Sequence, residues 1–209
     1  PGTVHLDLLQ NGKIDDPFFR LNEHKLQWID KIDWEYRTSF DVNDSHFNYE
    51  AIELDFFGLD TYANVFLNDS LIYSSENMFI GKTVNVKKKI KKGKNNLLVR
   101  FKSPIEVGIE KYDKLGYRLP DNANDLSEIG KVPGNKKVGV FERKAPYSFG
   151  WDWGPRLVTS GIWRPIKINF WNNFQIKDLH FTQIIEDDNA LIKGEVEVFS
   201  LLDNRNVIA

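Results

Sequence analysis

The 209-residue sequence contains no cysteine. This absence excludes a disulfide framework and thiol chemistry, although it does not fix a cellular compartment. The four histidines, His5, His24, His46 and His180, lie far apart in the sequence and lack the spacing of a metal site. No glycine-rich phosphate loop follows a strand-like segment. We therefore expect neither a metal nor another cofactor.

Long apolar runs and a strong charge of one sign are also missing. No apolar segment approaches the roughly 18 residues that a membrane-spanning helix requires. The net charge is only −2, from 28 basic and 30 acidic residues, which gives no electrostatic case for nucleic acid or a membrane as partner. The chain opens at Pro1 without a signal peptide, so the location stays open between export and a lysosome-like compartment.

Alternating hydrophobicity is what the sequence does have. In Trp34–Val42, large or β-branched residues occupy the even positions and polar ones the odd positions. Residues 52–56 repeat this pattern, and both predict half-buried strands. Tyr62–Leu67 is apolar on both faces, which predicts a central strand, and 68–70 reads as a hairpin turn before 71–73. Further strands are expected at 79–86, 97–102 and 162–170.

Helices, turns and loops are expected between these strands. Asn22 is placed to cap a short helix through Leu26 and Ile29, and the basic run 87–96 is typical of a solvated turn. Residues 103–137 lack a strand pattern, and part of them, 105–115, favours a helix. Loops of this length are usually functional, so we expect the stretch to border a site. Many short strands at this spacing indicate an all-β antiparallel sandwich, best described as a jelly roll.

An aromatic block at 143–165 is the candidate site. Three of the six tryptophans fall within it, among glycines and prolines that break a helix. If the segment is extended, Trp151 and Trp153 share one face and Asp152 points to the other. A carboxylate buried between indoles needs a partner, for which the candidates are Arg156, Arg143 or a ligand hydroxyl.

Aromatic rings beside a carboxylate are suited to holding a sugar. Two structural alternatives stand beside this hypothesis. The aromatic cluster is a core, with the glycines serving only as turns, or Asp152 only pairs with Arg156 and holds the turn.

Several long motifs resemble one family. FGWDWGPR followed by SGIWRP is similar to the signature block of β-mannosidases of glycoside hydrolase family 2, whose superfamily also holds β-galactosidases and β-glucuronidases. PGTVHLDLL, DPFFRLNEHKLQWI, DWEYRTSF and LDFFGLDTYANVFLN resemble its preceding segments in order. The similarity covers roughly residues 1–171. It implies a galactose-binding-like jelly-roll sugar-binding domain over 1–172 and the truncated start of an immunoglobulin-like sandwich over 173–209. The sequence pattern itself predicts two strands in the latter, at 176–185 and 191–199, joined by an acidic turn.

The resemblance also implies a function. The parent protein would be a retaining exo-β-mannosidase that hydrolyses terminal non-reducing β-D-mannose residues. Substrate would contact Asp152, Trp151 and Trp153, with Arg143 and Arg156 as support. Both catalytic glutamates would lie on a downstream barrel domain, this chain's partner.

No residue here is therefore assigned a catalytic role. A retaining glycosidase needs two carboxyl groups about 5–5.5 Å apart, and the close pairs here, Glu53/Asp55 and Glu195/Glu197, fit the solvated face of a strand. The alternatives are a free-standing carbohydrate-binding module, or the same domain of a β-galactosidase, β-glucuronidase or glucosaminidase.

Overall fold

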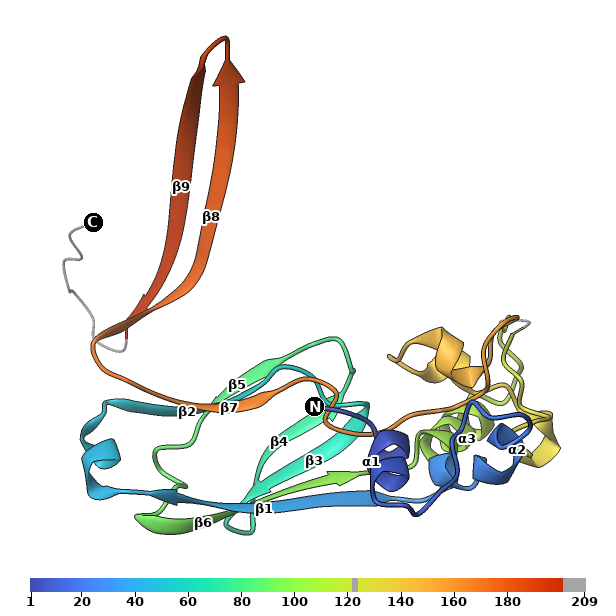
Figure 1. Cartoon of the computed structure of the whole chain (residues 1–209). Coiled ribbons are helices and arrows are strands. Elements are labelled where there is room, and N and C mark those ends of the chain that lie inside the picture. The colour runs from blue at the N-terminus through green and yellow to red at the C-terminus, as the bar shows by residue number, and fades with distance from the viewer. Residues whose placement is uncertain (122–123, 201–209) are drawn as a thin grey trace.

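Two antiparallel sheets face each other and form the body of the molecule (Figure 1). The structure is a computed structural model, and it describes residues 1–121 and 124–200. One sheet has the order β1 (Trp34–Val42), β6 (Gly93–Phe101), β3 (Tyr62–Leu67), β4 (Ser70–Glu76). The other has the order β5 (Lys82–Asn85), β2 (Ala51–Phe56), β7 (Ile166–Trp171). This arrangement confirms the expected antiparallel jelly-roll sandwich.

The main core fills the space between these sheets. Apolar side chains of period two enter it from both sides, as the alternation of β1 and β2 predicts. Its buried members come mainly from the interior strands: Val42, Ile52, Leu54, Phe56, Leu59, Ala63, Val65, Leu67, Val86, Ile90, Leu97, Val99 and Phe101. The central position predicted for Tyr62–Leu67 is confirmed, because β3 lies between β6 and β4.

Several strand limits differ from the predicted ones. The closing strand expected at 162–170 begins only at Ile166, as β7. The segment expected at 79–86 forms only β5, because Phe79 and Ile80 lie exposed before the ladder begins. The strand expected at 97–102 starts earlier, at Gly93, so the basic run ends inside β6. Asn95 explains the early start: it is fully buried, and its amide Nδ2 donates to the carbonyl oxygens of Lys91 (2.7 Å) and Gly93 (2.9 Å).

A 3₁₀ turn at Asp44–Asn48 lies at one end of the sandwich, and the α-helices gather at the other (Figure 1). They are α1 (Val4–Gln10), α2 (Glu23–Leu26) with a 3₁₀ turn at Ile29–Lys31 behind it, and α3 (Pro104–Leu115). Asn22 precedes α2 as predicted, but its side chain makes no capping bond and its Nδ2 donates instead to the carbonyl oxygen of Asp16 (2.9 Å). None of the helices in the described ranges is long and apolar enough to cross a membrane.

The long stretch after β6 packs behind the aromatic block. After α3 it contains only short 3₁₀ turns, at Pro133–Asn135 and Gly139–Phe141, and a further turn follows at Pro146–Phe149. A second core joins this stretch to the block through Ile105, Val132, Val138, Phe149 and Val158. Residues of this stretch therefore support the block from within. None of those that the structure describes lines the cleft beside the block, so the expectation that 103–137 borders the site stays a prediction.

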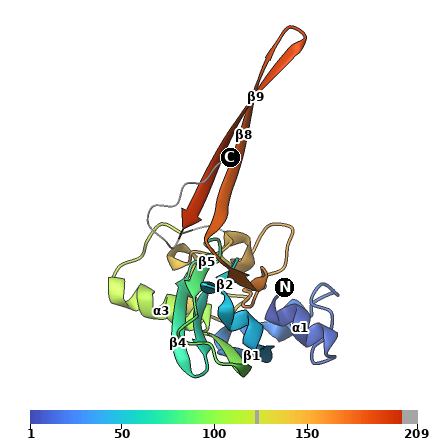
Figure 2. The same ribbon diagram turned by 90° about the vertical axis from the view of Figure 1, so that its left-hand side faces the viewer.

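A long hairpin leaves the sandwich after β7. It consists of β8 (Phe174–Glu186) and β9 (Asn189–Ser200), and it projects away from the two sheets (Figures 1 and 2). Its side chains are almost all exposed, including apolar ones such as Phe181 and Ile185. The two strands and their acidic turn are as predicted, whereas a separate domain over 173–209 stays a prediction. Residues 201–209 lie outside the described ones.

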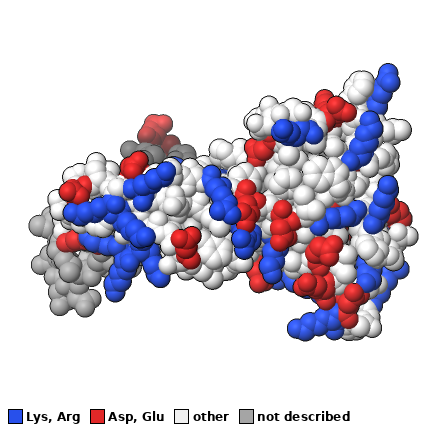
Figure 3. All heavy atoms as spheres, turned by 90° about the horizontal axis from the view of Figure 1, so that it is seen from below, with Lys and Arg blue, Asp and Glu red and all other residues white. Residues whose placement is uncertain are grey.

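Surface charges are mixed in sign. On the face seen in Figure 3, Lys and Arg side chains alternate with Asp and Glu side chains. Exposed ion pairs such as Arg37–Glu35 (2.5 Å) and Lys92–Asp44 (3.1 Å) are part of this pattern. Pairs of this kind contribute little to stability, and they serve mainly to keep the surface solvated.

Candidate functional site

The Trp-Asp-Trp segment forms a tight turn rather than the extended strand that we considered. Trp151 and Gly154 form an isolated antiparallel bridge, in which the Gly154 amide donates to the Trp151 carbonyl oxygen over 3.3 Å. Gly150 precedes the turn at φ +137, and a Cβ there would lie 2.3 Å from the carbonyl oxygen of Asn124. Only glycine fits this conformation and this close approach. The turn is thus pressed against the loop behind it and faces outward.

An aromatic cleft of about 690 Å³ lies beside the turn. Trp151, Trp153 and Tyr147 line one side, and they are 45%, 86% and 64% exposed. Phe18 and Phe79, from distant segments, and Trp163, near the end of the block, complete it. The volume and the apolar lining are those of a small-molecule site. The aromatic cluster is therefore mostly surface, which contradicts the alternative that it is a core.

Asp152 lies between the two tryptophans but is not among the residues that line the cleft. Its side chain is exposed, and within the described part of the chain it makes no ion pair or hydrogen bond. The opposition of the two indoles and the carboxylate was expected for an extended segment, and the segment is a turn instead. The premise that the carboxylate is buried is wrong for this chain, so Asp152 needs no internal partner.

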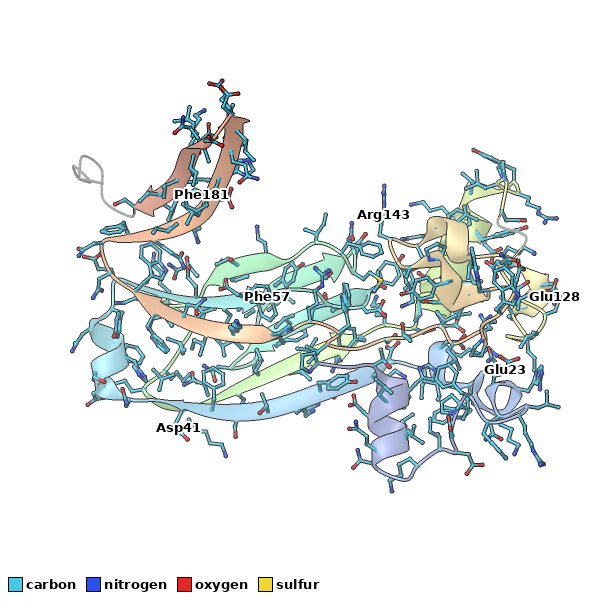
Figure 4. The ribbon with its side chains drawn as sticks, turned by 45° about the horizontal axis from the view of Figure 1, so that its top comes forward. Glu23, Asp41, Phe57, Glu128, Arg143 and Phe181 are labelled. Carbon is cyan, nitrogen blue, oxygen red and sulfur yellow. The ribbon has the colours of Figure 1, made fainter. Side chains whose placement is uncertain are left out.

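Arg143 is also exposed, at the same end of the molecule as the block (Figure 4). Its backbone is fixed, since its carbonyl oxygen accepts a hydrogen bond from the Met78 amide over 3.0 Å. The guanidinium forms no ion pair within 1–121 or 124–200. A supporting role for Arg143 stays a prediction.

A buried ion pair holds the start of the block, on the N-terminal side of the turn. Lys144 Nζ lies 2.5 Å from Asp60 Oδ1, and both side chains are almost completely buried. Thr159 ties the far end of the block to the same pair, because its Oγ1 donates to Asp60 Oδ2 (2.6 Å) and accepts from Lys144 Nζ (2.8 Å). Asp60 and Thr159 also contribute to the floor of the cleft. Hydrogen bonds thus connect Lys144 and Thr159, on either side of the exposed turn, to each other and to Asp60.

Arg156 holds the chain on the C-terminal side of the turn and is fully buried. Its Nη1 donates to Asp30 Oδ2 (2.6 Å) and to Gln27 Oε1 (2.5 Å). The Asp152–Arg156 ion pair that served as the structural alternative is not formed between these described residues, because Arg156 is committed to the α2 region. Arg156 therefore lies below the candidate sugar contact rather than in it.

Burial shifts the pKa values of several groups around the Lys144–Asp60 pair. Burial raises the pKa of Glu142 to about 7, against the opposing influence of Tyr62, Lys111 and Lys144. Neither carboxylate oxygen of Glu142 has a hydrogen-bond partner of normal geometry among the described residues. Burial, assisted by Lys144, lowers the pKa of His5 to about 4. This polar cluster beneath the block therefore responds to pH.

The close carboxylate pairs do not form a catalytic site. Glu195 and Glu197 are exposed on β9, as expected for a solvated face. The expectation for Glu53 is wrong: it is 6% exposed and accepts a hydrogen bond from Trp171 Nε1 over 2.8 Å. Asp55 is half-buried and accepts from Asn169 Nδ2. The inner position of β2 and the adjoining base of the hairpin cover this face.

Comparisons with known proteins agree with this geometry. Residues 1–164 match the family model described as glycosyl hydrolase 2 galactose-binding domain-like. The chain is 31% identical over 204 residues to a β-mannosidase of Mus musculus. This match covers 97% of this chain and 22% of that protein. The chain is 34% identical over 210 residues to β-mannosidase B of Thermothelomyces thermophilus, covering 98% and 22%.

A solved structure is similar over the same length. The β-D-mannosidase from Dictyoglomus thermophilum superposes with a TM-score of 0.85 at 40% identity, covering 96% of this chain and 23% of that one. The chain therefore spans only about a fifth of the length of the relatives that it matches.

Proposed function

This chain belongs to the glycosyl hydrolase 2 galactose-binding domain-like family, and we propose that it is the N-terminal sugar-binding domain of a retaining exo-β-mannosidase. In this proposal it supplies one wall of the site for a terminal non-reducing β-D-mannose residue. A downstream barrel domain supplies the two catalytic carboxyl groups. Within the described residues, neither close carboxylate pair lies in a cleft, so the chemical step is assigned to that partner.

The observation that carries the proposal is the exposed turn at Trp151–Gly154. It presents Asp152 without an internal partner, flanked by two indoles that are themselves largely exposed. An exposed carboxylate accepts hydrogen bonds from sugar hydroxyls, and aromatic rings pack against the apolar face of a sugar. Asp152 is thus assigned to the hydroxyl contacts, and Trp151 and Trp153 to shaping the wall. Exposed Arg143 remains the candidate support.

The test uses the complete enzyme that contains this chain. A hydrogen bond to a charged group contributes about 1.5–3 kcal/mol, so Asp152→Asn is expected to lower kcat/KM for an aryl β-mannoside about 10- to 150-fold. The melting temperature is expected to change little, because the Asp152 side chain is exposed and makes no hydrogen bond or ion pair within the described chain. Asp41→Asn is the matched control, since Asp41 is exposed on β1 at the opposite end of the sandwich (Figure 4). A variant with normal kcat/KM would overturn the assignment.

Two other functions predict different results. A free-standing carbohydrate-binding module would bind mannose as the isolated chain, whereas a domain that lends one wall binds it weakly without its partner. Calorimetric titration of the isolated chain with mannose separates these two cases. The same domain of a β-galactosidase, β-glucuronidase or glucosaminidase would show the Asp152→Asn loss on that sugar and not on the mannoside.

A further inference from the structure

The Trp-Asp-Trp turn has little that holds it in place by itself. Trp153 is 86% exposed, and the Asp152 side chain contacts no partner in the part of the chain that the structure describes. The turn is closed by a single backbone hydrogen bond of 3.3 Å between residues 151 and 154. The position of the Asp152 carboxylate therefore depends on how the chain is held on either side of the turn.

On the C-terminal side of the turn, the chain is held at Arg156 through both its backbone and its side chain. The Arg156 amide donates to Glu23 Oε2 (3.2 Å), and its carbonyl oxygen accepts from Gln27 Nε2 (2.8 Å). The guanidinium is fixed at the same time by Gln27 and Asp30. All of these contacts come from the α2 region, at the helical end of the molecule where Glu23 is seen in Figure 4.

The link from this clamp to the turn is short. Only Gly154 and Pro155 separate Arg156 from Trp153, and the proline ring fixes φ at Pro155 near −65°. The guanidinium also has no room to shift, because a Cβ built on Gly130 would lie 2.3 Å from Arg156 Cζ. Gly154 is the flexible residue of this link, but with only two residues between Arg156 and Trp153 a displacement at Arg156 also shifts the turn.

A buried ion pair is weak evidence for stability in itself, because desolvation of the two charges offsets their attraction. The Arg156 clamp fixes a backbone amide, a backbone carbonyl and a side chain at one residue, which is more than charge neutralisation needs. We propose that Arg156 is a positioning residue that places the Asp152 carboxylate for the sugar, acting through the clamp with Glu23, Gln27 and Asp30. This inference rests on the function proposed above.

Lysine keeps the charge of Arg156, but its side chain ends one bond earlier, so its ammonium does not reach the position from which Nη1 donates to both Gln27 and Asp30. In the complete enzyme, Arg156→Lys is therefore expected to lower kcat/KM for an aryl β-mannoside about 10- to 100-fold, as small misplacements near a site do. The experiment is a double-mutant cycle of Arg156→Lys with Asp152→Asn, measured well below the melting temperature of every variant. Arg37→Lys, at an exposed ion pair on β1, is the matched control.

A positioning role predicts strong coupling between the two changes. The loss caused by Arg156→Lys should be at least fivefold smaller when Asp152 is already Asn. Any smaller reduction, including an equal loss in both backgrounds, overturns the positioning role while the sugar contact stands. If Asp152→Asn alone leaves kcat/KM unchanged, the proposed function fails and the inference falls with it. If Arg156→Lys does not fold, Gln27→Met, which removes two of the clamp's hydrogen bonds, is judged by the same criterion.

Discussion

Glu142 offers the sharpest test of the buried polar cluster beneath the aromatic block. It is 9% exposed, and Gly108 of α3 packs so closely that an added Cβ would lie 3.2 Å from Glu142 Oε1. Burial raises its pKa from 4.5 to about 7. Between these values the folded chain holds a proton that the unfolded chain has lost, so unfolding releases a proton. The free energy of unfolding therefore falls as pH rises through this window.

The size of the effect follows from the same two values. Since one pKa unit corresponds to about 1.4 kcal/mol, the gap between 4.5 and about 7 is equivalent to about 3 kcal/mol. Glu142→Gln removes the titration and keeps the size of the side chain. The stability of the variant relative to the natural chain is expected to improve by about 3 kcal/mol from below pH 4.5 to above pH 7.

The measurement is urea unfolding of both chains, followed by circular dichroism from pH 4.5 to 7.5. Glu110→Gln, an exposed change on α3, is the matched control and should give a difference that does not vary with pH. His5 has the opposite effect. Because burial lowers its pKa from 6.5 to about 4, the free energy of unfolding falls as pH falls through this window. Glu142→Gln should therefore expose a steeper loss of stability in acid. A constant Glu142→Gln difference across the range would refute the buried, ionisable state described for Glu142.

The remaining predictions concern packing, mobility and activity. Gly130→Ala should lower the free energy of unfolding by about 1–3 kcal/mol, because its methyl group would overlap the clamped guanidinium of Arg156; an unchanged urea midpoint would contradict this packing. Phe149→Ala should cost about 3–5 kcal/mol in the same assay, since Phe149 is 1% exposed in the second core. Limited proteolysis should cut at 171–176 or 186–189 before Tyr62–Leu67, because the hairpin projects and β3 is buried; early cleavage in β3 would count against the core. The isolated chain should not hydrolyse an aryl β-mannoside, and turnover that disappears in Glu195→Gln would contradict this expectation.

Most of the sandwich could be predicted because strand periodicity is a local property of the sequence. β1 buries one face, which can be read at every second residue. The apolar face of β2 is readable in the same way, although both faces of that strand are buried. The turn at Asn68 and Asp69 was likewise visible, and both residues adopt positive φ there. The late start of the strand predicted at 79–86 was not visible, because Phe79 lies outside the ladder and packs edge-on against Trp163, far away in the sequence.

The site could be located from the sequence, but its supports could not. The composition of the aromatic block predicts the turn directly. By contrast, Arg156 pairs with Asp30, 126 positions away in the sequence, and Lys144 pairs with Asp60, 84 positions away. No local pattern distinguishes these charged residues from solvated ones. Glu53 was misjudged for the same reason, since the indole that buries it comes from Trp171, 118 positions later. Alternation predicts which face a side chain occupies, and distant segments then decide whether that face is covered.

The central claim is that Asp152 contacts the sugar, and a crystal structure of the complete enzyme with a mannose-configured inhibitor tests it most directly. The account predicts that an Asp152 carboxylate oxygen lies within about 2.5–3.0 Å of a sugar hydroxyl oxygen, as in a charge-assisted hydrogen bond. Trp151 and Trp153 should border the same pocket. An inhibitor bound in the barrel with the Asp152 carboxylate facing solvent, beyond hydrogen-bond reach of every sugar hydroxyl, would contradict the account.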